Sequence, residues 1–312
     1  MENAMRILDL VGNTPLIELV KIARDAPGVR LLAKAEFCNP SGSVKDRAAK
    51  AMLLDGMEKG ALAGEKIIID ATSGNTGIAY AMMGAALGFA VKLYMPANTS
   101  IERKQIIRSF GAVIEETSPL EGSDGAFLAV QAEVAARPGL YFYPDQYNNA
   151  ANPRAHFEST GPEIWKQTEG AVTHFITGMG TTGTFVGVSR RLKAENPAVR
   201  TIAVQPSSPF HGIEGTKHMG STILPGIFDK SLQDGVAPVS TEDAYAMTRR
   251  LAREEGVFAG ISSGGNVAAA LALAKGLPAG SVVVTVLCDS GSRYISDVFW
   301  ENETVHSDGG GI

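Results

Sequence analysis

Residues 40–47 read Pro-Ser-Gly-Ser-Val-Lys-Asp-Arg and place Lys45 on a glycine- and serine-rich turn where a helical pattern begins. A second turn of this kind, at residues 72–77 (TSGNTG), joins an apolar strand-like run to another helical pattern. Its backbone N–H groups and polar side chains suit a carboxylate at a helix N-terminus. A lysine amine becomes a covalent catalyst by forming a Schiff base with a carbonyl compound, commonly pyridoxal phosphate. Although a single lysine is usually a solvated surface charge, the two turns together indicate amino-acid chemistry.

Composition narrows the class of protein. The chain has 312 residues, 45% hydrophobic and 20% charged, as in a globular enzyme large enough for two lobes. Its net charge of −5 disfavours nucleic-acid binding, and its sequence shows neither a signal peptide nor an apolar run of ~18 residues. Cys38 and Cys288 are the only cysteines, which favours a reducing compartment. We therefore expect a cytoplasmic protein without membrane or nucleic-acid partners.

Short apolar runs alternate with helical patterns along the chain. This alternation predicts an α/β fold of mainly parallel sheets flanked by helices. The strand-like runs are 66–70, 90–95, 112–115, 173–177, 201–205 and 281–287. The helical patterns cover 44–59, 76–87, 101–110, 125–136, 183–195, 241–255 and 266–274.

Two further glycine-rich turns precede helical patterns. Residues 178–184 (GMGTTGT) either hold a phosphate with backbone amides and threonine hydroxyls or form a tight packing turn. In residues 261–265 (ISSGG), Ser262 or Ser263 either caps the next helix or faces a ring nitrogen of a cofactor. We expect the turns after Asp70, Thr177 and Ala259 to follow strands and to converge on one crevice. The five histidines show no metal-ligand spacing, so no metal site is expected.

In their residues and their order along the chain, these motifs resemble those of the fold-type II enzymes that use pyridoxal 5'-phosphate, and among them the cysteine synthases (O-acetylserine sulfhydrylases). The matching motifs are NTPL at 13–16, PSGSVKDR at 40–47, ATSGNTGIA at 71–79, GTTGT at 180–184 and GISSGG at 260–265. The GTTGT loop looks like that of the B-type cysteine synthases. The resemblance covers nearly the whole chain and implies a two-lobed, tryptophan synthase β-like fold.

The resemblance also implies roles for individual residues. Lys45 would form the Schiff base, Asn75 would bond the ring hydroxyl of the cofactor, and Ser262 would face the pyridine nitrogen, with Ser263 still open. The phosphate would be held by Gly180, Thr181, Thr182, Gly183 and Thr184. The substrate carboxylate would be held by Thr72, Ser73, Thr76 and Gln146. A smaller mobile lobe would span residues 41–148, and a larger lobe would combine residues 1–40 and 149–312.

The activity implied is β-replacement, which makes L-cysteine from O-acetyl-L-serine and sulfide through an aminoacrylate intermediate. Thiosulfate as the sulfur donor would give S-sulfocysteine. The alternatives are use of O-phosphoserine, a cystathionine β-synthase type of activity, and serine or threonine dehydration. A serine beside the pyridine nitrogen weakens the cofactor as an electron sink, which favours elimination over transamination.

Two segments add expectations about substrates and partners. Lys217 is either a solvated loop lysine or a cation that meets an acidic leaving group or an anionic nucleophile. The glycine-rich tail at 307–312 is expected to be flexible. The resemblance further implies a homodimer and leaves serine acetyltransferase open as a partner.

Overall fold

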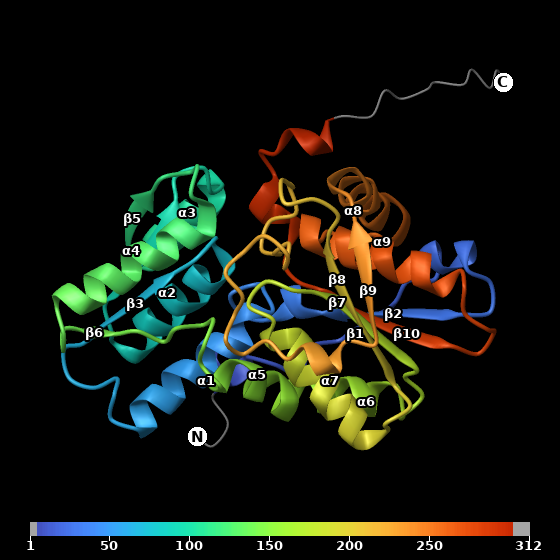
Figure 1. The fold of residues 1–312 in the computed structure, drawn as a ribbon, viewed down its shortest axis with the longest axis horizontal. Coiled ribbons are helices and arrows are strands. Elements are labelled where there is room, and N and C mark those ends of the chain that lie inside the picture. Colours follow the sequence, from blue (N-terminus) through green and yellow to red (C-terminus); the bar gives the residue numbers. More distant parts are fainter. Residues whose placement is uncertain (1–4, 302–312) are drawn as a thin grey trace.

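The computed structural model describes residues 5–301, which form two sheets lying side by side, each flanked by helices (Figure 1). The smaller sheet has the strand order β5-β4-β3-β6 and is parallel throughout. The larger has the order β1-β2-β10-β7-β8-β9, in which only β1 pairs antiparallel, with β2. The strands are β1 (Leu16–Glu18), β2 (Arg30–Ala35), β3 (Ile67–Ala71), β4 (Val91–Pro96), β5 (Val113–Thr117), β6 (Tyr141–Phe142), β7 (His174–Gly178), β8 (Arg200–Pro206), β9 (Gly235–Val239) and β10 (Val282–Leu287).

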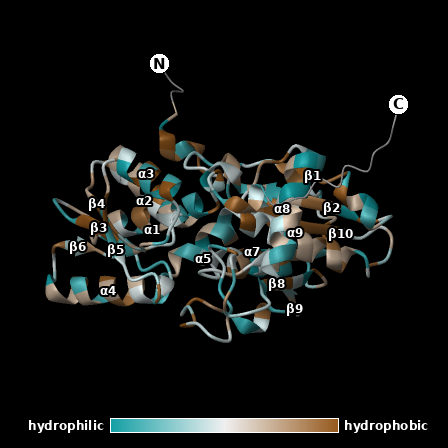
Figure 2. Ribbon diagram, turned by 90° about the horizontal axis from the view of Figure 1, so that it is seen from above, coloured by the Kyte–Doolittle hydropathy of each residue, from teal (hydrophilic) through white to brown (hydrophobic). Residues whose placement is uncertain are grey.

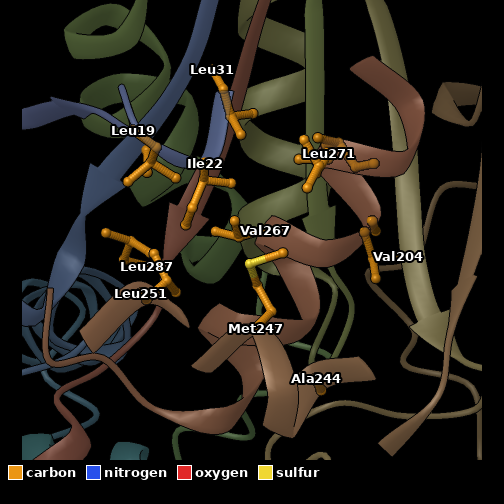
Figure 3. Close-up of a cluster of buried hydrophobic side chains, with 14 of the residues drawn as sticks. Leu19, Ile22, Leu31, Val204, Ala244, Met247, Leu251, Val267, Leu271 and Leu287 are labelled. Carbon is orange, nitrogen blue, oxygen red and sulfur yellow. The ribbon is translucent and has the colours of Figure 1, made fainter. Parts of the chain in front are cut away.

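Helices cover both faces of each sheet because successive strand residues point to opposite sides. In β3, Ile68 packs with α1 and α2, whereas Ile69 packs with α4. In β10, Val283 joins the core under α8 and α9 (Figure 3), whereas Val284 packs with α6 and α7. Apolar residues run along the strands, while α8 shows polar and apolar residues (Figure 2). The helices are α1 (Lys45–Glu58), α2 (Asn75–Leu87), α3 (Ile101–Ser109), α4 (Gly122–Ala136), α5 (Ala151–Ala155), α6 (Gly161–Gln167), α7 (Gly183–Glu195), α8 (Thr241–Glu255) and α9 (Ile261–Ala274).

The predicted α/β class, with mainly parallel sheets between helices, is confirmed. Each predicted strand appears within one or two residues of its expected bounds, and α7 and α8 have the expected bounds. The strands β1, β2, β6 and β9 were not predicted. Of these, β2 carries the buried Lys34 in its apolar run, and β9 contains Pro238 at an edge of the sheet, so neither resembles a typical buried strand.

The prediction for residues 259–265 is wrong in two respects. No strand ends at Ala259, which makes only an isolated bridge with Ser290. Helix α9 begins at Ile261, so neither Ser262 nor Ser263 is its N-cap; that position belongs to Gly260. The glycines suggested a turn, yet a Cβ at Gly264 would collide with α8, so this glycine allows two helices to pack closely.

The boundaries at residues 41 and 148 stay a prediction. Helix α1 packs into the core of the smaller sheet, where Met52 and Leu53 contact apolar side chains of α2 and β3. Ala151 of α5 belongs to the same core although it lies beyond the proposed boundary.

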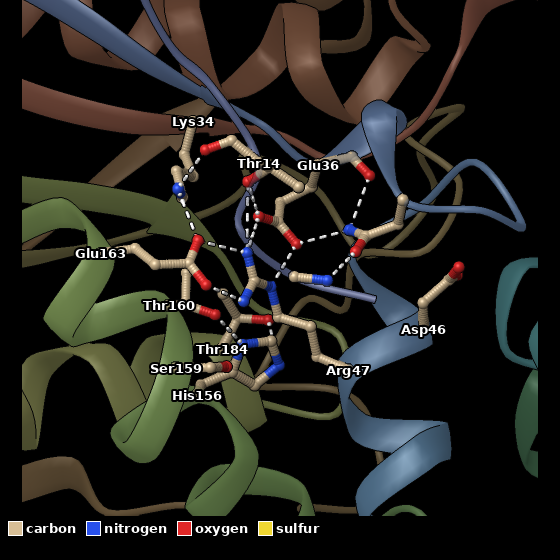
Figure 4. A network of polar contacts seen from close by, with 12 residues as sticks. Thr14, Lys34, Glu36, Asp46, Arg47, His156, Ser159, Thr160, Glu163 and Thr184 are labelled. Atoms are coloured by element: carbon tan, nitrogen blue, oxygen red, sulfur yellow. Dashed lines mark hydrogen bonds and ion pairs between the residues drawn. The ribbon is translucent and has the colours of Figure 1, made fainter. Parts of the chain in front are cut away.

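A buried ionic network holds the first turn of α1 against the larger sheet (Figure 4). The Arg47 guanidinium donates to both carboxylate oxygens of Glu36, each at 2.8 Å, and to those of Glu163, at 2.6 and 2.8 Å. Lys34 pairs with Glu163 at 2.6 Å, and the Thr14 hydroxyl donates to Glu36 at 2.7 Å. Such bidentate pairs are geometrically specific, so the network fixes the chain at the start of α1.

Replacing Glu163 with Gln should lower stability and remove part of its pH dependence. Burial alone would raise the pKa of Glu163, but Arg47 and Lys34 outweigh it and lower the pKa to about 2. An unfolded glutamate has a pKa of about 4.3, so the ionised native group stabilises the fold above that pH and loses this contribution as pH falls toward 2. We expect Glu163→Gln to cost on the order of 2 kcal/mol at pH 7 and almost nothing near pH 2, measured by chemical unfolding across this range.

The matched control is Glu18→Gln, which breaks the Arg30 pair, whose side chains are 54% and 42% exposed. Exposed pairs contribute little, so this variant should stay close to the wild type. A Glu163→Gln profile parallel to that of the wild type from pH 7 to pH 3 would contradict the assignment.

Candidate active site

The glycine-rich turns meet at two adjoining cavities that are both lined by Lys45. We call them the Ser73 cavity and the Ser262 cavity, each after a residue that lines it and not the other. Both are lined by Lys45, Asn75, Gly180, Thr181, Gly215 and Thr216. The Ser73 cavity is also lined by Thr76, Arg103, Ser123, Gln146, Tyr147 and Lys217. The Ser262 cavity is also lined by Thr182, Thr184, Glu214 and Cys288.

Lys45 is the first residue of α1, and its backbone N–H donates to the Ser43 hydroxyl at 3.2 Å. Burial of the amine lowers its pKa, and the nearby Cys288 and Asp289 only partly oppose this effect. Within residues 5–301 no hydrogen bond or ion pair engages its Nζ atom. A buried amine with a lowered pKa is more often neutral, which is the form that attacks a carbonyl carbon or takes a proton.

The turn at 72–77 begins α2 after β3. The Thr72 hydroxyl accepts hydrogen bonds from the N–H groups of Gly74 (2.9 Å) and Gly77 (3.1 Å) and so shapes the turn. The Thr76 hydroxyl donates to Gln146 Oε1 at 2.8 Å. Of the four proposed carboxylate ligands, Ser73, Thr76 and Gln146 line the Ser73 cavity, whereas Thr72 does not.

Asn75 connects this turn to residues that the sequence did not single out. Its Nδ2 donates to Asp289 Oδ2 at 2.7 Å, and its Oδ1 accepts from the Arg293 guanidinium. Arg103 of α3 also reaches this cluster, with its guanidinium bonded to the Tyr294 hydroxyl and 3.8 Å from Asp289. Only the position of Asp289, two residues after the carboxyl end of β10, could have marked it as a site residue.

The loop at 178–184 is folded tightly around the start of α7. Thr182 has φ +71°, and Cβ atoms at Gly180 and Gly183 would collide with Gly215 and Asn152. The loop therefore brings the backbone N–H groups of the helix N-terminus to the Ser262 cavity, where they suit an anion. Thr182 lines this cavity, and its hydroxyl is buried without a hydrogen-bond partner, which indicates a polar ligand nearby.

His156 supports the loop from behind. Its Nε2 lies 3.2 Å from the Thr184 hydroxyl and its Nδ1 lies 2.9 Å from the Thr160 hydroxyl (Figure 4). Burial, together with the Arg47 charge, lowers the pKa of His156 to about 3. The imidazole is therefore neutral at physiological pH and fixes the side chain of Thr184.

The two serines at the start of α9 have different surroundings. Ser263 is fully buried, and its hydroxyl accepts a hydrogen bond from the Cys288 N–H at 2.8 Å. Ser262 lines the Ser262 cavity. This geometry favours Ser262 as the residue that meets a ligand.

Lys217 lines the Ser73 cavity and is only 9% exposed, so it is not a solvated loop lysine. Its Nζ donates to Asp124 Oδ1 of α4 at 2.7 Å and to the Thr222 hydroxyl at 2.9 Å. The sequence did not single out Asp124.

Residues 7–289 match the sequence profile of the family described as "Pyridoxal-phosphate dependent enzyme". The chain belongs to this family. It is 52% identical over 302 residues to a cysteine synthase of Aquifex aeolicus, covering 95% of this chain and 92% of that protein. It is 43% identical to cysteine synthase B of Salmonella typhimurium, covering 97% and 98%. The crystal structure of cysteine synthase from Entamoeba histolytica superposes with a TM-score of 0.90 at 34% identity, covering 97% of this chain and 92% of that one.

The residues of this pyridoxal-phosphate enzyme fit the cofactor. The Thr182 hydroxyl and the α7 N-terminus suit its phosphate, the Lys45 amine suits its aldehyde, and Ser262 suits its ring nitrogen. Asn75 uses one of the two N–H donors of its amide on Asp289 and keeps the other for the ring hydroxyl. Between residues 5 and 301 no helix is long and apolar enough to cross a bilayer, and no three acidic, histidine or cysteine side chains gather as metal ligands.

Replacing Thr182 with Val should weaken cofactor binding without destabilising the protein. Valine keeps the branched shape but removes a buried hydroxyl that has no protein partner. A hydrogen bond to a charged group contributes about 1.5–3 kcal/mol, so we expect the affinity for pyridoxal phosphate to fall about tenfold or more. Fluorescence titration of the apoprotein measures this affinity.

Ser189→Ala is the matched control, because the Ser189 hydroxyl is also buried and unpartnered but lines neither cavity. It should leave the affinity unchanged. Equal affinities for Thr182→Val and Ser189→Ala would show that the phosphate does not contact Thr182.

Proposed function

We propose that this protein is a cysteine synthase that uses pyridoxal 5'-phosphate to make L-cysteine and acetate from O-acetyl-L-serine and sulfide. The curated relatives named cysteine synthase support this activity. The observation that carries it is that the glycine-rich turns at 72–77 and 178–184 line two cavities that both include Lys45.

The reaction exchanges one substituent of the β-carbon. The α-proton is removed, the bond between the β-carbon and the ester oxygen breaks, and acetate leaves with the electron pair. Hydrosulfide then forms the new carbon–sulfur bond, and a proton returns to the α-carbon. When bound, the cofactor withdraws electrons from the α-carbon and so makes its proton acidic.

The side chains divide the remaining work. The Lys45 amine takes the α-proton and returns it, which the lowered pKa of this amine favours. Thr72, Ser73, Thr76 and Gln146 hold the substrate carboxylate. Ser262 lines the cavity as a neutral hydrogen-bonding group, which suits elimination better than transamination.

The cellular setting follows from the same reasoning. We propose a homodimer in the cytoplasm, with small-molecule substrates. The two free thiols, Cys38 and Cys288, support a reducing compartment. Serine acetyltransferase stays a prediction from the resemblance, and the glycine-rich tail lies outside the described residues.

The test is product identification with the purified protein loaded with pyridoxal phosphate. We expect cysteine from O-acetylserine and sulfide, and S-sulfocysteine when thiosulfate replaces sulfide. Pyruvate from serine without sulfide would instead indicate a dehydratase, and cystathionine from homocysteine a cystathionine β-synthase. Light scattering of the same sample tests the dimer.

Lys45→Ala should reduce cysteine formation about 10³-fold or more, because it removes both the covalent anchor and the base. Borohydride should attach the cofactor to the wild type but not to the variant, as read by mass spectrometry. The control is Lys59→Ala, at the other end of α1, where the lysine is 68% exposed. Cysteine formation by Lys45→Ala at the rate of Lys59→Ala would refute the assignment.

Ser73→Ala should raise the KM for O-acetylserine about tenfold while leaving thermal stability unchanged. Among the described residues, no protein group bonds the Ser73 hydroxyl, so it is free to meet the carboxylate. Thr72→Val should also lower the melting temperature, because two backbone N–H groups lose their acceptor. An unchanged KM in Ser73→Ala would place the carboxylate elsewhere.

A further inference from the structure

The Lys217 ammonium is partnered within the protein. Two of its three N–H groups donate, one to Asp124 (2.7 Å) and one to Thr222 (2.9 Å), and the Tyr147 ring lies with its centroid 4.9 Å from Nζ. Asp124 belongs to α4 of the smaller sheet, whereas Lys217 lies on the segment after β8 of the larger one. The pair therefore links the two sheets beside the Ser73 cavity, which Lys217 lines, and both residues line a neighbouring pocket that also includes Ser73.

Arg103, a second cation that lines the Ser73 cavity, is also paired with a carboxylate. The Arg103 guanidinium bonds the Glu214 carboxylate, the Tyr294 hydroxyl and the Ser73 carbonyl oxygen. Arg103 is 2% exposed and lies against Gly74, where a Cβ would collide with its side chain. Apart from Lys45, each cation lining the Ser73 cavity in residues 5–301 is thus matched by a carboxylate.

We propose that Asp124 determines leaving-group specificity by neutralising Lys217, so that the enzyme selects serine esters with an uncharged side chain over O-phosphoserine. This inference rests on the proposed function. It assigns Lys217 to a masked pair and not to direct substrate contact. Asp124 acts through Lys217 and is a specificity-determining residue, not a catalytic one.

The physical reason is the charge of the substrate. A phosphate ester carries a charge of about −1.5 to −2 at pH 7 and needs donors or cations that are free to approach it. Here the Lys217 charge is already paired with the Asp124 carboxylate, which also repels a phosphate group. An acetyl ester brings no charge and is not penalised.

The test is the ratio of kcat/KM for O-phosphoserine to that for O-acetylserine, measured at pH 8 on one preparation of holoenzyme. Both substrates meet the same active fraction, so the ratio is insensitive to partial unfolding. Asp124→Asn keeps the shape of the side chain and frees the Lys217 charge. We expect the ratio to rise about tenfold, the size of one partly screened charge interaction, and inorganic phosphate to become a stronger competitive inhibitor.

A second variant tests whether Lys217 causes the rise in the ratio. Lys217→Met in the Asp124→Asn background should return the ratio to about the wild-type value. The control is Glu195→Gln, which removes the same charge from the Arg191 pair at the last residue of α7, about 18 Å along the helix from the cavity. It should leave the ratio unchanged.

An unchanged ratio in Asp124→Asn would overturn the proposal, since the pair would then serve structure alone. A gain that persists in the double variant would overturn it too, because Lys217 would not be the group responsible. Wild-type enzyme that makes no cysteine from O-acetylserine refutes the proposed function itself. If the wild type does make cysteine but Asp124→Asn leaves the ratio unchanged, only this inference is refuted.

Discussion

The arrangement of the site depends on the clamp that Glu36 and Glu163 form around the Arg47 guanidinium. A buried guanidinium is costly unless its donors are paired, and here both carboxylates bind it bidentately. Glu36 follows β2 and Glu163 lies on α6, so the clamp ties the first turn of α1 to the larger sheet. The rest of α1 packs into the core of the smaller sheet. Lys45 is held between the two sheets as a result.

Around that amine, anion sites are built from backbone more than from cations. Helices α2 and α7 begin at glycine-rich turns, where N–H groups have no partner within the helix. Apart from Lys45, the cations that line the Ser73 cavity among residues 5–301 are instead paired with carboxylates, as Lys217 is with Asp124. The site can therefore attract a carboxylate and a phosphate without a large positive field, which would also draw other anions.

The sequence predicted the features that are local and missed those that need distant partners. A glycine-rich turn before a helical pattern is visible in a few residues, so the turns that carry Lys45 and line the two cavities were predicted. Strand β2 was not predicted because its buried Lys34 pairs with Glu163, which is far away in the sequence. Asp289 was not predicted for the same reason, because it acts through its hydrogen bond with the distant Asn75. The start of α9 was misjudged because a glycine that serves helix packing looks the same as one that ends a helix.

The balance of charge near Lys45 accounts for the carboxylate beside this buried amine. Burial lowers the pKa of Lys45, and Arg293 and Arg103 lower it further, while Asp289 raises it. Without Asp289 the two guanidiniums would repel any proton on the amine more strongly and would lose a buried partner. With it, they stay fixed as hydrogen-bond donors to Asn75 and Tyr294. The cluster thus holds the turn of α2 in place while leaving the amine able both to accept a proton and to release it.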